Sequence, residues 1–231
     1  IDASYRRTKN YQQEVDFILR RVGNNPGRKI VIDVACGSGR HAELLSKSGF
    51  EVYGVDLNDG MLRLVKKNLP NARVFKQDMR HLNVPVKADV LICMYNSINY
   101  NYSYAELSHT LQRFYDHLKP GGVVIFDTAF MEHTWKPGPF SVETITTPEF
   151  EVARVNKSSR RRSFGIVDIV FVIFEKGRKK IVETENKIFL PERERLLTLM
   201  KQIGFETKVY FDFSDKKRSG IVSVFVGRKE R

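Results

Sequence analysis

The sequence has few cysteines and no long apolar run. Its 231 residues contain only Cys36 and Cys93, and each stands at the end of an apolar run that is expected to form a buried strand. This usage is typical of a protein from a reducing compartment. The longest apolar run, residues 166–174, is too short to cross a bilayer and is interrupted by Asp168. The first residues also lack a signal-like apolar stretch. We therefore expect a cytoplasmic protein with no membrane partner.

The chain also lacks a linker rich in proline, glycine and serine, an internal repeat and a low-complexity tract. Its length allows one sizeable hydrophobic core. Its composition of 42% apolar and 29% charged residues is typical of a globular protein. We therefore predict a single core domain that carries an insertion.

Basic residues are in excess. Lysine and arginine number 39 against 27 acidic residues, which gives a formal net charge of +12. Clusters of basic residues occur at 160–162, 176–180 and 216–218. A basic surface can attract nucleic acid or an anionic substrate. Because all three clusters fall where turns are expected, solvated hairpin tips are the favoured interpretation.

Apolar periodicity predicts alternating helices and strands in the first 129 residues. A helix with an apolar stripe from Tyr11 to Val22 precedes a first strand at 29–34. Further strands are expected at 51–56, 72–76, 88–94 and 123–126, and helices at 40–47, 59–69 and after the capping-box pattern Ser103-x-x-Glu106. Strands that alternate with helices imply an open parallel sheet with right-handed crossovers.

The pattern changes after about residue 141. Apolar alternation predicts strands at 142–147, 150–157, 164–174 and 180–190, joined by short polar turns. Pro191 suits the first turn of a helix, and the runs at 207–213 and 221–226 predict a closing β-hairpin. The domains are therefore expected to be a core at 1–129, an antiparallel β insertion at 130–190, and a C-terminal helix and hairpin at 191–231 that complete the core.

A glycine-rich stretch follows the first predicted strand. The chain reads Asp33-Val34-Ala35-Cys36-Gly37-Ser38-Gly39 there, and the second predicted strand ends on Asp56. Glycines let the backbone approach a ligand closely, and an acid at the end of the next strand can accept hydrogen bonds from ribose hydroxyls. The stretch Gly37 to Ala42 also satisfies a relaxed dinucleotide fingerprint, so a nicotinamide oxidoreductase is one alternative. A helix before the first strand, the acid Asp33 inside that strand and the antiparallel hairpin argue against it.

The order of motifs resembles the class I S-adenosylmethionine-dependent methyltransferases. Their first motif, acid-x-Gly-x-Gly-x-Gly, matches Asp33–Gly39 except that Ala35 replaces the first glycine. Asp56-Leu57, Gln77-Asp78-Met79 and Leu118–Gly122 follow in the family's order. The resemblance implies an α/β fold with a Rossmann-like sheet, in which parallel strands are joined by one antiparallel closing strand and an antiparallel β insertion follows strand five.

The resemblance further implies S-adenosyl-L-methionine as the cofactor, S-adenosyl-L-homocysteine as the product, and no metal. Asp33 would attract the cofactor's ammonium group, Asp56 would hold the ribose hydroxyls, and Asp78 with Met79 would flank the adenine. The residues expected to contact the cofactor are Tyr5, Tyr11, Asp33, Ala35, Cys36, Gly37, Gly39, His41, Asp56, Leu57, Met61, Gln77, Asp78, Met79, Met94, Tyr95 and Asn96. The alternatives are capping for Asp56 and Asp78, core packing for Met61 and Met94, and a simple surface position for His41.

Aromatic residues follow the predicted fourth strand, where the acceptor sits in this fold. Tyr95, Tyr100 and Tyr102 are among them, and aromatic faces suit a sulfonium or a protonated amine. Enzymes that methylate exocyclic base amines usually carry an Asp/Asn-Pro-Pro-aromatic run at this point, and those that act on pyrimidine C5 carry Pro-Cys. The chain reads Cys93-Met94-Tyr95-Asn96-Ser97, which matches neither. A small-molecule acceptor, specifically an amine, is therefore favoured.

Within the family, the chain is similar to the branch that contains the N,N-dimethyltransferases of nucleotide-linked amino sugars. The similarity rests on Tyr5 and Tyr11, the run Asp-Val-Ala-Cys-Gly at Asp33–Gly37, the run Gln77–Arg80 and the β-rich insertion. It implies that Tyr100 lies beside the acceptor nitrogen as the candidate catalytic base. The alternative for this residue is an ordinary loop tyrosine that packs on the cofactor lid.

Other functions stay open on the sequence. The basic surface leaves an RNA methyltransferase as the main alternative, with nucleic acid as a less favoured partner than a small molecule. A cofactor-binding protein without catalysis is a second alternative, in which the insertion would mediate formation of a homodimer. The insertion is thus expected to be either an acceptor lid or a dimer surface.

Overall fold

The structure is a computed structural model that describes residues 9–22 and 29–230. The fold separates into two compact units. The larger unit contains Asn10–Ala129 and Arg193–Arg231, and the smaller contains Phe130–Glu192. The larger unit therefore joins the first half of the chain to its C-terminal end.

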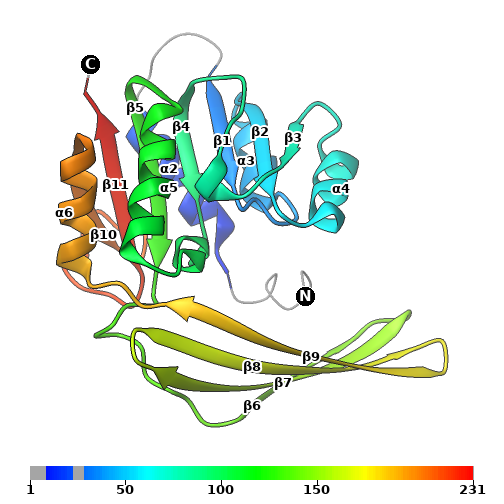
Figure 1. The fold of residues 1–231 in the computed structure, drawn as a ribbon. Coiled ribbons are helices and arrows are strands. Elements are labelled where there is room, and N and C mark those ends of the chain that lie inside the picture. The colour runs from blue at the N-terminus through cyan, green and yellow to red at the C-terminus, as the bar shows by residue number, and fades with distance from the viewer. Residues whose placement is uncertain (1–8, 23–28, 231) are drawn as a thin grey trace. The chain divides into compact units, whose positions relative to one another are not determined.

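A seven-stranded sheet forms the centre of the larger unit (Figure 1). Its strands lie in the order β10-β11-β5-β4-β1-β2-β3. Strands β1 to β5 pair in parallel, whereas β11 is antiparallel to both of its neighbours. The predicted fold class, a parallel sheet with one antiparallel closing strand, is confirmed. The strands are β1 (Ile30–Val34), β2 (Glu51–Asp56), β3 (Arg73–Lys76), β4 (Ala88–Cys93), β5 (Leu118–Thr128), β10 (Phe205–Phe211) and β11 (Ser223–Lys229).

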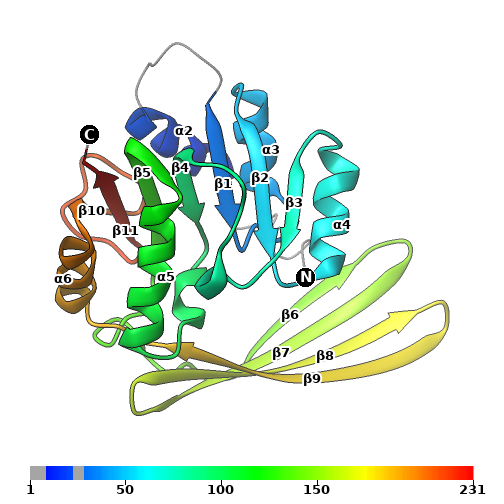
Figure 2. The same ribbon diagram turned by 45° about the horizontal axis from the view of Figure 1, so that its top comes forward.

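Helices cover both faces of this sheet, as Figures 1 and 2 show. Helices α2 (Tyr11–Val22) and α3 (Arg40–Lys47) pack together on one face, and α5 (Tyr104–Asp116) and α6 (Arg193–Ile203) pack together on the other. Helix α4 (Asp59–Asn68) lies beside the edge strand β3. Two short 3-10 helices, η1 (Met79–His81) and η2 (Ser97–Tyr100), follow β3 and β4. No helix within the described residues is long and apolar enough to cross a membrane.

The carboxyl ends of β1 to β5 meet at one edge of the sheet because these strands run in the same direction. The glycine-rich loop follows β1, Asp56 ends β2, and Gln77-Asp78 follows β3. The segment that leads to η2 follows β4 at the same edge. Open sheets of this kind bind ligands beyond the carboxyl ends of their strands. The topology therefore gathers the predicted site segments along one edge.

Some element boundaries differ from the sequence prediction. The last helix begins at Arg193 rather than at Pro191. Strand β5 extends back to Leu118, which pairs with Ala88 before a register shift and before regular pairing resumes at Val123. Gly121 and Gly122 therefore belong to an irregular part of β5 and do not form a separate turn before the strand.

Two side chains also differ from expectation. Strand β10 ends at Phe211, and Phe213 has a left-handed φ of 55° in the turn that follows. The apolar pattern of the helix predicted at 59–69 also places Leu64 in the core, but Leu64 is exposed because α4 packs through Leu62 and Val65.

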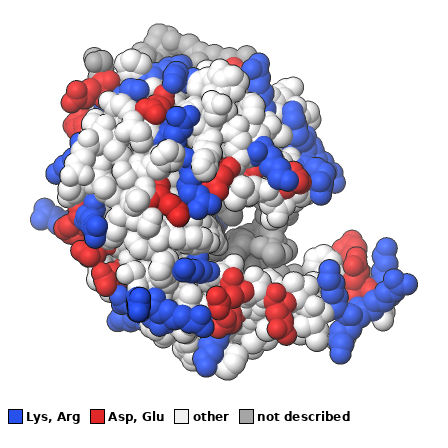
Figure 3. All heavy atoms as spheres, viewed as in Figure 1, with Lys and Arg blue, Asp and Glu red and all other residues white. Residues whose placement is uncertain are grey.

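The smaller unit is a four-stranded antiparallel sheet. Its strands pair in chain order: β6 (Ser141–Thr146), β7 (Phe150–Arg161), β8 (Phe164–Glu175) and β9 (Arg178–Phe189). The basic clusters at 160–162 and 176–180 occupy the β7–β8 and β8–β9 turns and the strand ends beside them. Figure 3 shows basic side chains gathered at the end of the sheet where β8 turns into β9. The expected position of these clusters at hairpin tips is confirmed.

Candidate functional site

The loop after β1 has a left-handed backbone. The φ angle is 55° at Ala35, 53° at Gly37 and 83° at Gly39. A Cβ atom added to Gly39 would lie 3.0 Å from a methyl group of Val65, so the absence of a side chain lets the loop pack on α4. A Cβ atom added to Gly37 would meet nothing within 4 Å. One side of the loop is therefore packed, and the backbone at Gly37 has open space beside it for a ligand.

Asp56, at the end of β2, holds this loop in place. Its Oδ2 accepts a hydrogen bond from the Gly37 N–H at 2.8 Å, and its Oδ1 accepts one from the Asn58 N–H at 2.9 Å. The capping role considered for Asp56 is thus present. A carboxylate oxygen can accept more than one hydrogen bond, and Asp56 is only half-buried. It can therefore cap the loop and bind ribose hydroxyls as well, and the second role stays a prediction.

Asp33, Cys36 and Met94 belong to the interior beneath the loop. Asp33 is 1% exposed and lies in register with Gly54 on one side and Ile92 on the other. The Cys36 side chain packs close to Gly54, and burial raises the pKa of its thiol far above the usual range. Met94 is 3% exposed within the core cluster. The side chains of Cys36 and Met94 therefore contribute to packing, and their contact with the cofactor stays a prediction.

His41, in the first turn of α3, is buried. Its Nε2 lies 2.6 Å from Oε2 of Glu14 on α2, and both residues are less than a tenth exposed. The imidazole also meets the ring of Tyr11 edge-on, with 5.1 Å between ring centroids. A surface position for His41 is therefore wrong. The pair joins α2 to the helix that follows the glycine-rich loop, and Tyr11 packs beside the same imidazole.

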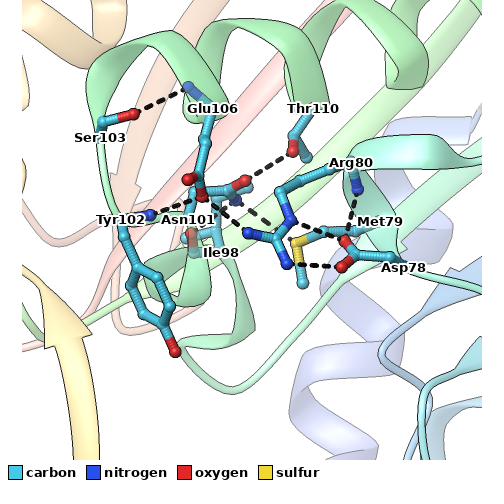
Figure 4. A network of polar contacts seen from close by, with 9 residues as sticks. All are labelled: Asp78, Met79, Arg80, Ile98, Asn101, Tyr102, Ser103, Glu106 and Thr110. Carbon is cyan, nitrogen blue, oxygen red and sulfur yellow. Dashed lines mark hydrogen bonds and ion pairs between the residues drawn. The ribbon is translucent and has the colours of Figure 1, made fainter.

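Asp78 begins an ionic network after β3 (Figure 4). Arg80 donates from Nε to Oδ1 of Asp78 at 3.0 Å and from Nη2 to Oδ2 at 2.6 Å, and its Nη1 donates to Oε2 of Glu106 at 2.9 Å. The hydrogen bonds from Arg80 lower the pKa of Asp78. The backbone N–H of Tyr102, together with Arg80, lowers the pKa of Glu106. Both carboxyl groups are therefore ionised at neutral pH.

The neighbours of Asp78 are also held by protein groups. Gln77 donates from Nε2 to the carbonyl oxygen of Asn83 at 2.9 Å and accepts from its N–H at 2.8 Å. Met79 Sδ accepts a weak hydrogen bond from Asn101 Nδ2 at 3.4 Å. The Gln77 amide thus closes the loop 77–83, and the contact of Gln77 with the cofactor stays a prediction.

The loop after β4 also has an unusual backbone. Tyr95 and Asn96 have φ angles of 62° and 59°, which residues with side chains rarely adopt. The Tyr95 N–H donates to Oδ1 of Asp127 at the end of β5, and Oδ1 of Asn96 accepts from the Ala129 N–H at 2.6 Å. Such residues persist where their surroundings hold them, and they cluster at functional sites. The β5 end therefore supports the loop that leads to Tyr100.

Large apolar side chains are exposed on this edge. Leu57 after β2 is 61% exposed, and Tyr95, Tyr100 and Tyr102 after β4 are each between 39% and 45% exposed. Neighbouring exposed apolar groups mark binding surfaces more often than scattered ones do. The edge thus carries the aromatic surface expected for a cofactor and an acceptor. Among the other predicted residues, Met61 is half-buried in the first turn of α4, and Tyr5 lies outside the described residues.

Sequence reasoning missed the supporting residues Glu14, Arg80, Glu106 and Asp127. Asp127 had a signal, because it follows the apolar run 123–126 as Asp56 follows the second strand. Glu106 was interpreted only as part of a helix cap. Glu14 had no signal, since a single acid in an amphipathic helix is normally solvated.

Comparison with known proteins identifies the family to which this site belongs. Residues 31–122, from β1 to the irregular part of β5, match a model of a methyltransferase domain. A dTDP-3-amino-3,4,6-trideoxy-alpha-D-glucopyranose N,N-dimethyltransferase of Streptomyces venezuelae is 30% identical over 173 residues, which cover 74% of this chain and 73% of that protein. The chain belongs to the class I S-adenosylmethionine-dependent methyltransferases.

Solved structures share the fold. The sugar N-methyltransferase KedS8 from a Streptoalloteichus species aligns with a TM-score of 0.88 at 24% identity, covering 100% of this chain and 92% of that one. DesVI of Streptomyces venezuelae aligns with a TM-score of 0.85 at 26% identity, covering 99% of this chain and 96% of that one. These alignments extend over the four-stranded sheet as well as the larger unit.

Proposed function

We propose that this methyltransferase transfers methyl groups from S-adenosyl-L-methionine to the amino group of a nucleotide-linked amino sugar. The observation that carries the proposal is the 30% identity, over 74% of the chain, to a relative named as an amino-sugar N,N-dimethyltransferase. The exposed tyrosines after β4 support an amine acceptor, because aromatic faces favour cationic groups.

The residues at the carboxyl edge fit the cofactor. The backbone at Gly37 has open space beside it, and the Asp56 carboxylate, which accepts from the Gly37 N–H, would also accept from ribose hydroxyls. Asp78 is ionised, so it would accept a hydrogen bond from the adenine amine. The bound cofactor would supply a methyl group activated by a sulfonium, and the surrounding residues would bind and orient it.

Tyr100 is the proposed catalytic base or proton acceptor for the amine. It is 45% exposed at the end of η2, and the segment before it is fixed by hydrogen bonds to the end of β5. A hydroxyl at this position can accept a hydrogen bond from the amine and direct its lone pair toward the methyl carbon.

Mass analysis of reaction products tests the proposal. The full chain would be incubated with S-adenosyl-L-methionine and a dTDP-linked 3-amino sugar, and the same sugar nucleotide with a hydroxyl in place of the amine serves as control. We expect one and then two methyl groups on the amino compound and none on the hydroxyl compound. Methylation of both compounds would contradict an amine acceptor.

The RNA alternative is tested in the same assay. Total RNA replaces the sugar nucleotide at low and moderate salt, and a variant with Arg160, Arg161 and Arg162 neutralised is compared. Methyl transfer to RNA that weakens with salt and with the variant would overturn the proposal. We expect no transfer to RNA in either protein.

Tyr100→Phe tests the assigned role. Removal of the hydroxyl is expected to lower kcat by about a hundredfold while KM for the amine changes little. Tyr102→Phe is the matched control, since Tyr102 is a similarly exposed tyrosine of the same segment. An unchanged kcat in Tyr100→Phe would leave Tyr100 as a packing residue.

The smaller unit is proposed to form a dimer surface. Register places Val142, Val172, Phe174 and Ile181 on one face of its sheet, and all except Val172 are strongly exposed. Light scattering of the full chain is expected to give the mass of a dimer, and Phe174→Glu is expected to give a monomer. A monomeric wild-type chain would favour the acceptor-lid role instead.

A further inference from the structure

Side chains join two segments that follow strands β3 and β4, which are separated in the sheet by β1 and β2. The first, residues 77–82 after β3, carries Asp78 and Met79, which are expected to flank the adenine. The second, residues 95–106 after β4, carries the exposed tyrosines and the start of α5. Figure 4 shows the Arg80 guanidinium between them, directed toward Asp78 on one side and Glu106 on the other.

We propose that Arg80 is a positioning residue that orients the Asp78 carboxylate toward the adenine amine and couples cofactor binding to the order of the acceptor loop, residues 95–102. This inference rests on the proposed function.

The geometry at Asp78 supports the orienting role. Nε and Nη2 of Arg80 each bond a different oxygen of the carboxylate, so the two planar groups lie fork to fork. The backbone N–H of Arg80 also donates to Oδ1 at 2.9 Å. Such a bidentate pair fixes the direction of the carboxylate, which a single ammonium group cannot do. The lone pairs that Arg80 does not use are then held in fixed directions, available to a donor such as an exocyclic amine.

Glu106 connects Arg80 to the acceptor loop. Its Oε2 accepts from Arg80 Nη1 at 2.9 Å and from the Tyr102 N–H at 3.0 Å. The Glu106 N–H in turn donates to Ser103 Oγ at 3.1 Å. The acid of this capping box thus reaches back to Tyr102 rather than to the Ser103 N–H. One carboxylate oxygen therefore ties the end of the acceptor loop to Arg80.

A second link, buried and uncharged, runs beside the first. Asn101 Nδ2 donates to Met79 Sδ at 3.4 Å and to the Ile98 carbonyl oxygen at 3.0 Å, and Thr110 Oγ1 donates to Asn101 Oδ1 at 2.6 Å. Asn101 and Thr110 are both fully buried. Both residues that flank the predicted adenine site are therefore attached to the acceptor segment, so a shift of one segment displaces the other.

Discrimination between two product analogues tests the orienting role. S-adenosylhomocysteine carries the adenine amine, and S-inosylhomocysteine carries an oxygen in its place. Calorimetry is expected to show that the wild-type chain prefers the amine, and that Arg80→Met reduces this preference about tenfold, with partial rescue by Arg80→Lys. Thermal unfolding of each variant verifies that it is folded at the temperature of the titration.

Arg113→Met is the matched control. Arg113 donates from Nε and Nη2 to the Leu82 carbonyl oxygen at 2.9 Å and 2.7 Å, so it joins α5 to the same segment without a bond to Asp78. We expect it to lower stability and to leave the discrimination ratio unchanged. An equal loss of discrimination in Arg113→Met and Arg80→Met would show general loosening and overturn the proposal.

Hydrogen exchange tests the coupling. S-adenosylhomocysteine is expected to slow amide exchange in residues 95–102 of the wild-type chain, and Glu106→Gln is expected to lose most of that slowing while it still binds the ligand. Slowing that persists in both Glu106→Gln and Arg80→Met would contradict the coupling. Failure of the wild-type chain to bind S-adenosylhomocysteine would instead contradict the proposed function.

Discussion

Ala35 stands where the family motif has its first glycine, and it keeps the backbone conformation that glycine favours. Its φ of 55° lies in the left-handed region, in which a Cβ atom crowds the following carbonyl oxygen. The next two φ angles of this kind, at Gly37 and Gly39, carry no such cost. The departure from the motif therefore changes the stability of the loop more than its shape.

Ala35→Gly is expected to stabilise the chain by about 0.5–1 kcal/mol, because relief of the left-handed strain exceeds the added entropy of the unfolded chain. Urea unfolding measures the difference. Ala42→Gly is the control, since Ala42 is buried in helix α3 and glycine there costs about 1 kcal/mol. A loss of stability in Ala35→Gly would show that the methyl group packs more favourably than the strain costs.

His117 is a buried histidine that the structure holds neutral. Its Nδ1 donates to the Arg113 carbonyl oxygen at 2.7 Å, and its Nε2 accepts from the Val84 N–H at 3.3 Å. Burial lowers its pKa more than the hydrogen bond to the Arg113 carbonyl oxygen raises it, and the charges of Arg113 and Lys87 lower it further. Protonation of His117 at Nε2 would replace this acceptor with an N–H group that faces the Val84 N–H. The folded state therefore binds the His117 proton less tightly than the unfolded chain does.

Because the folded pKa of His117 lies below the unfolded value of about 6.5, its contribution to stability is fully present above that value. It is lost as the pH falls from there through the folded pKa. Urea unfolding between about pH 5 and pH 7.5 is expected to show this loss in the wild-type chain and a flatter profile in His117→Gln. His109→Gln, at an exposed position of α5, is the control and should keep the wild-type slope. A wild-type slope in His117→Gln would assign the effect to another group.

At the scale of elements, a buried pair attaches α2 to α3, the helix that follows the glycine-rich loop. Glu14 of α2 and His41 of α3 lie 2.6 Å apart, and Tyr11 packs against the same imidazole. Helix α2 also buries Val15, Phe17 and Ile18 against the sheet. Apolar packing thus holds the helix, and the polar pair sets its position over the start of α3.

Breaking the pair with Glu14→Ala or His41→Ala is expected to cost about 3 kcal/mol in either single variant, because the remaining partner is buried without its counterpart. The double variant should cost clearly less than the sum. Glu43→Ala, which breaks the exposed pair of Glu43 and Lys47 on α3, should cost less than about 0.5 kcal/mol. Additive losses in a thermal or urea double-mutant cycle would mean that the pair is not coupled.

Most elements of the fold were predictable from the sequence, because each buries a face whose period is visible locally. The helix Tyr11–Val22 and the strand Glu51–Asp56 were predicted at their observed bounds. The predicted boundaries were wrong where pairing between distant segments decides them. Leu118, for example, extends β5 because it pairs with Ala88. The acids at the strand ends were predictable from position. The pairs of Glu14 with His41 and of Arg80 with Glu106 were not predictable, because only the fold brings these distant residues together.

At the scale of the whole molecule, some residues of the basic clusters form ion pairs with acidic residues. Arg160 lies 2.8 Å from Glu132, and Arg161 lies 3.7 Å from Glu185. On the face in Figure 3, acidic side chains stand among the basic ones over both units. Such exposed pairs add little stability. They do reduce the local field that a polyanion would meet, which agrees with a small-molecule acceptor as the proposed partner.

The central claim is that the carboxyl edge of the sheet binds S-adenosylmethionine, with Asp56 on its ribose. Calorimetric titration of the full chain with S-adenosylhomocysteine tests it most directly. Asp56→Ala is the test variant. Asp59→Ala is the control, because it breaks an exposed pair with Lys76. We predict saturable binding to one site, a loss of at least about tenfold in affinity in Asp56→Ala, and no change in Asp59→Ala. No binding by the wild-type chain, or equal binding by wild type and Asp56→Ala, would contradict the account.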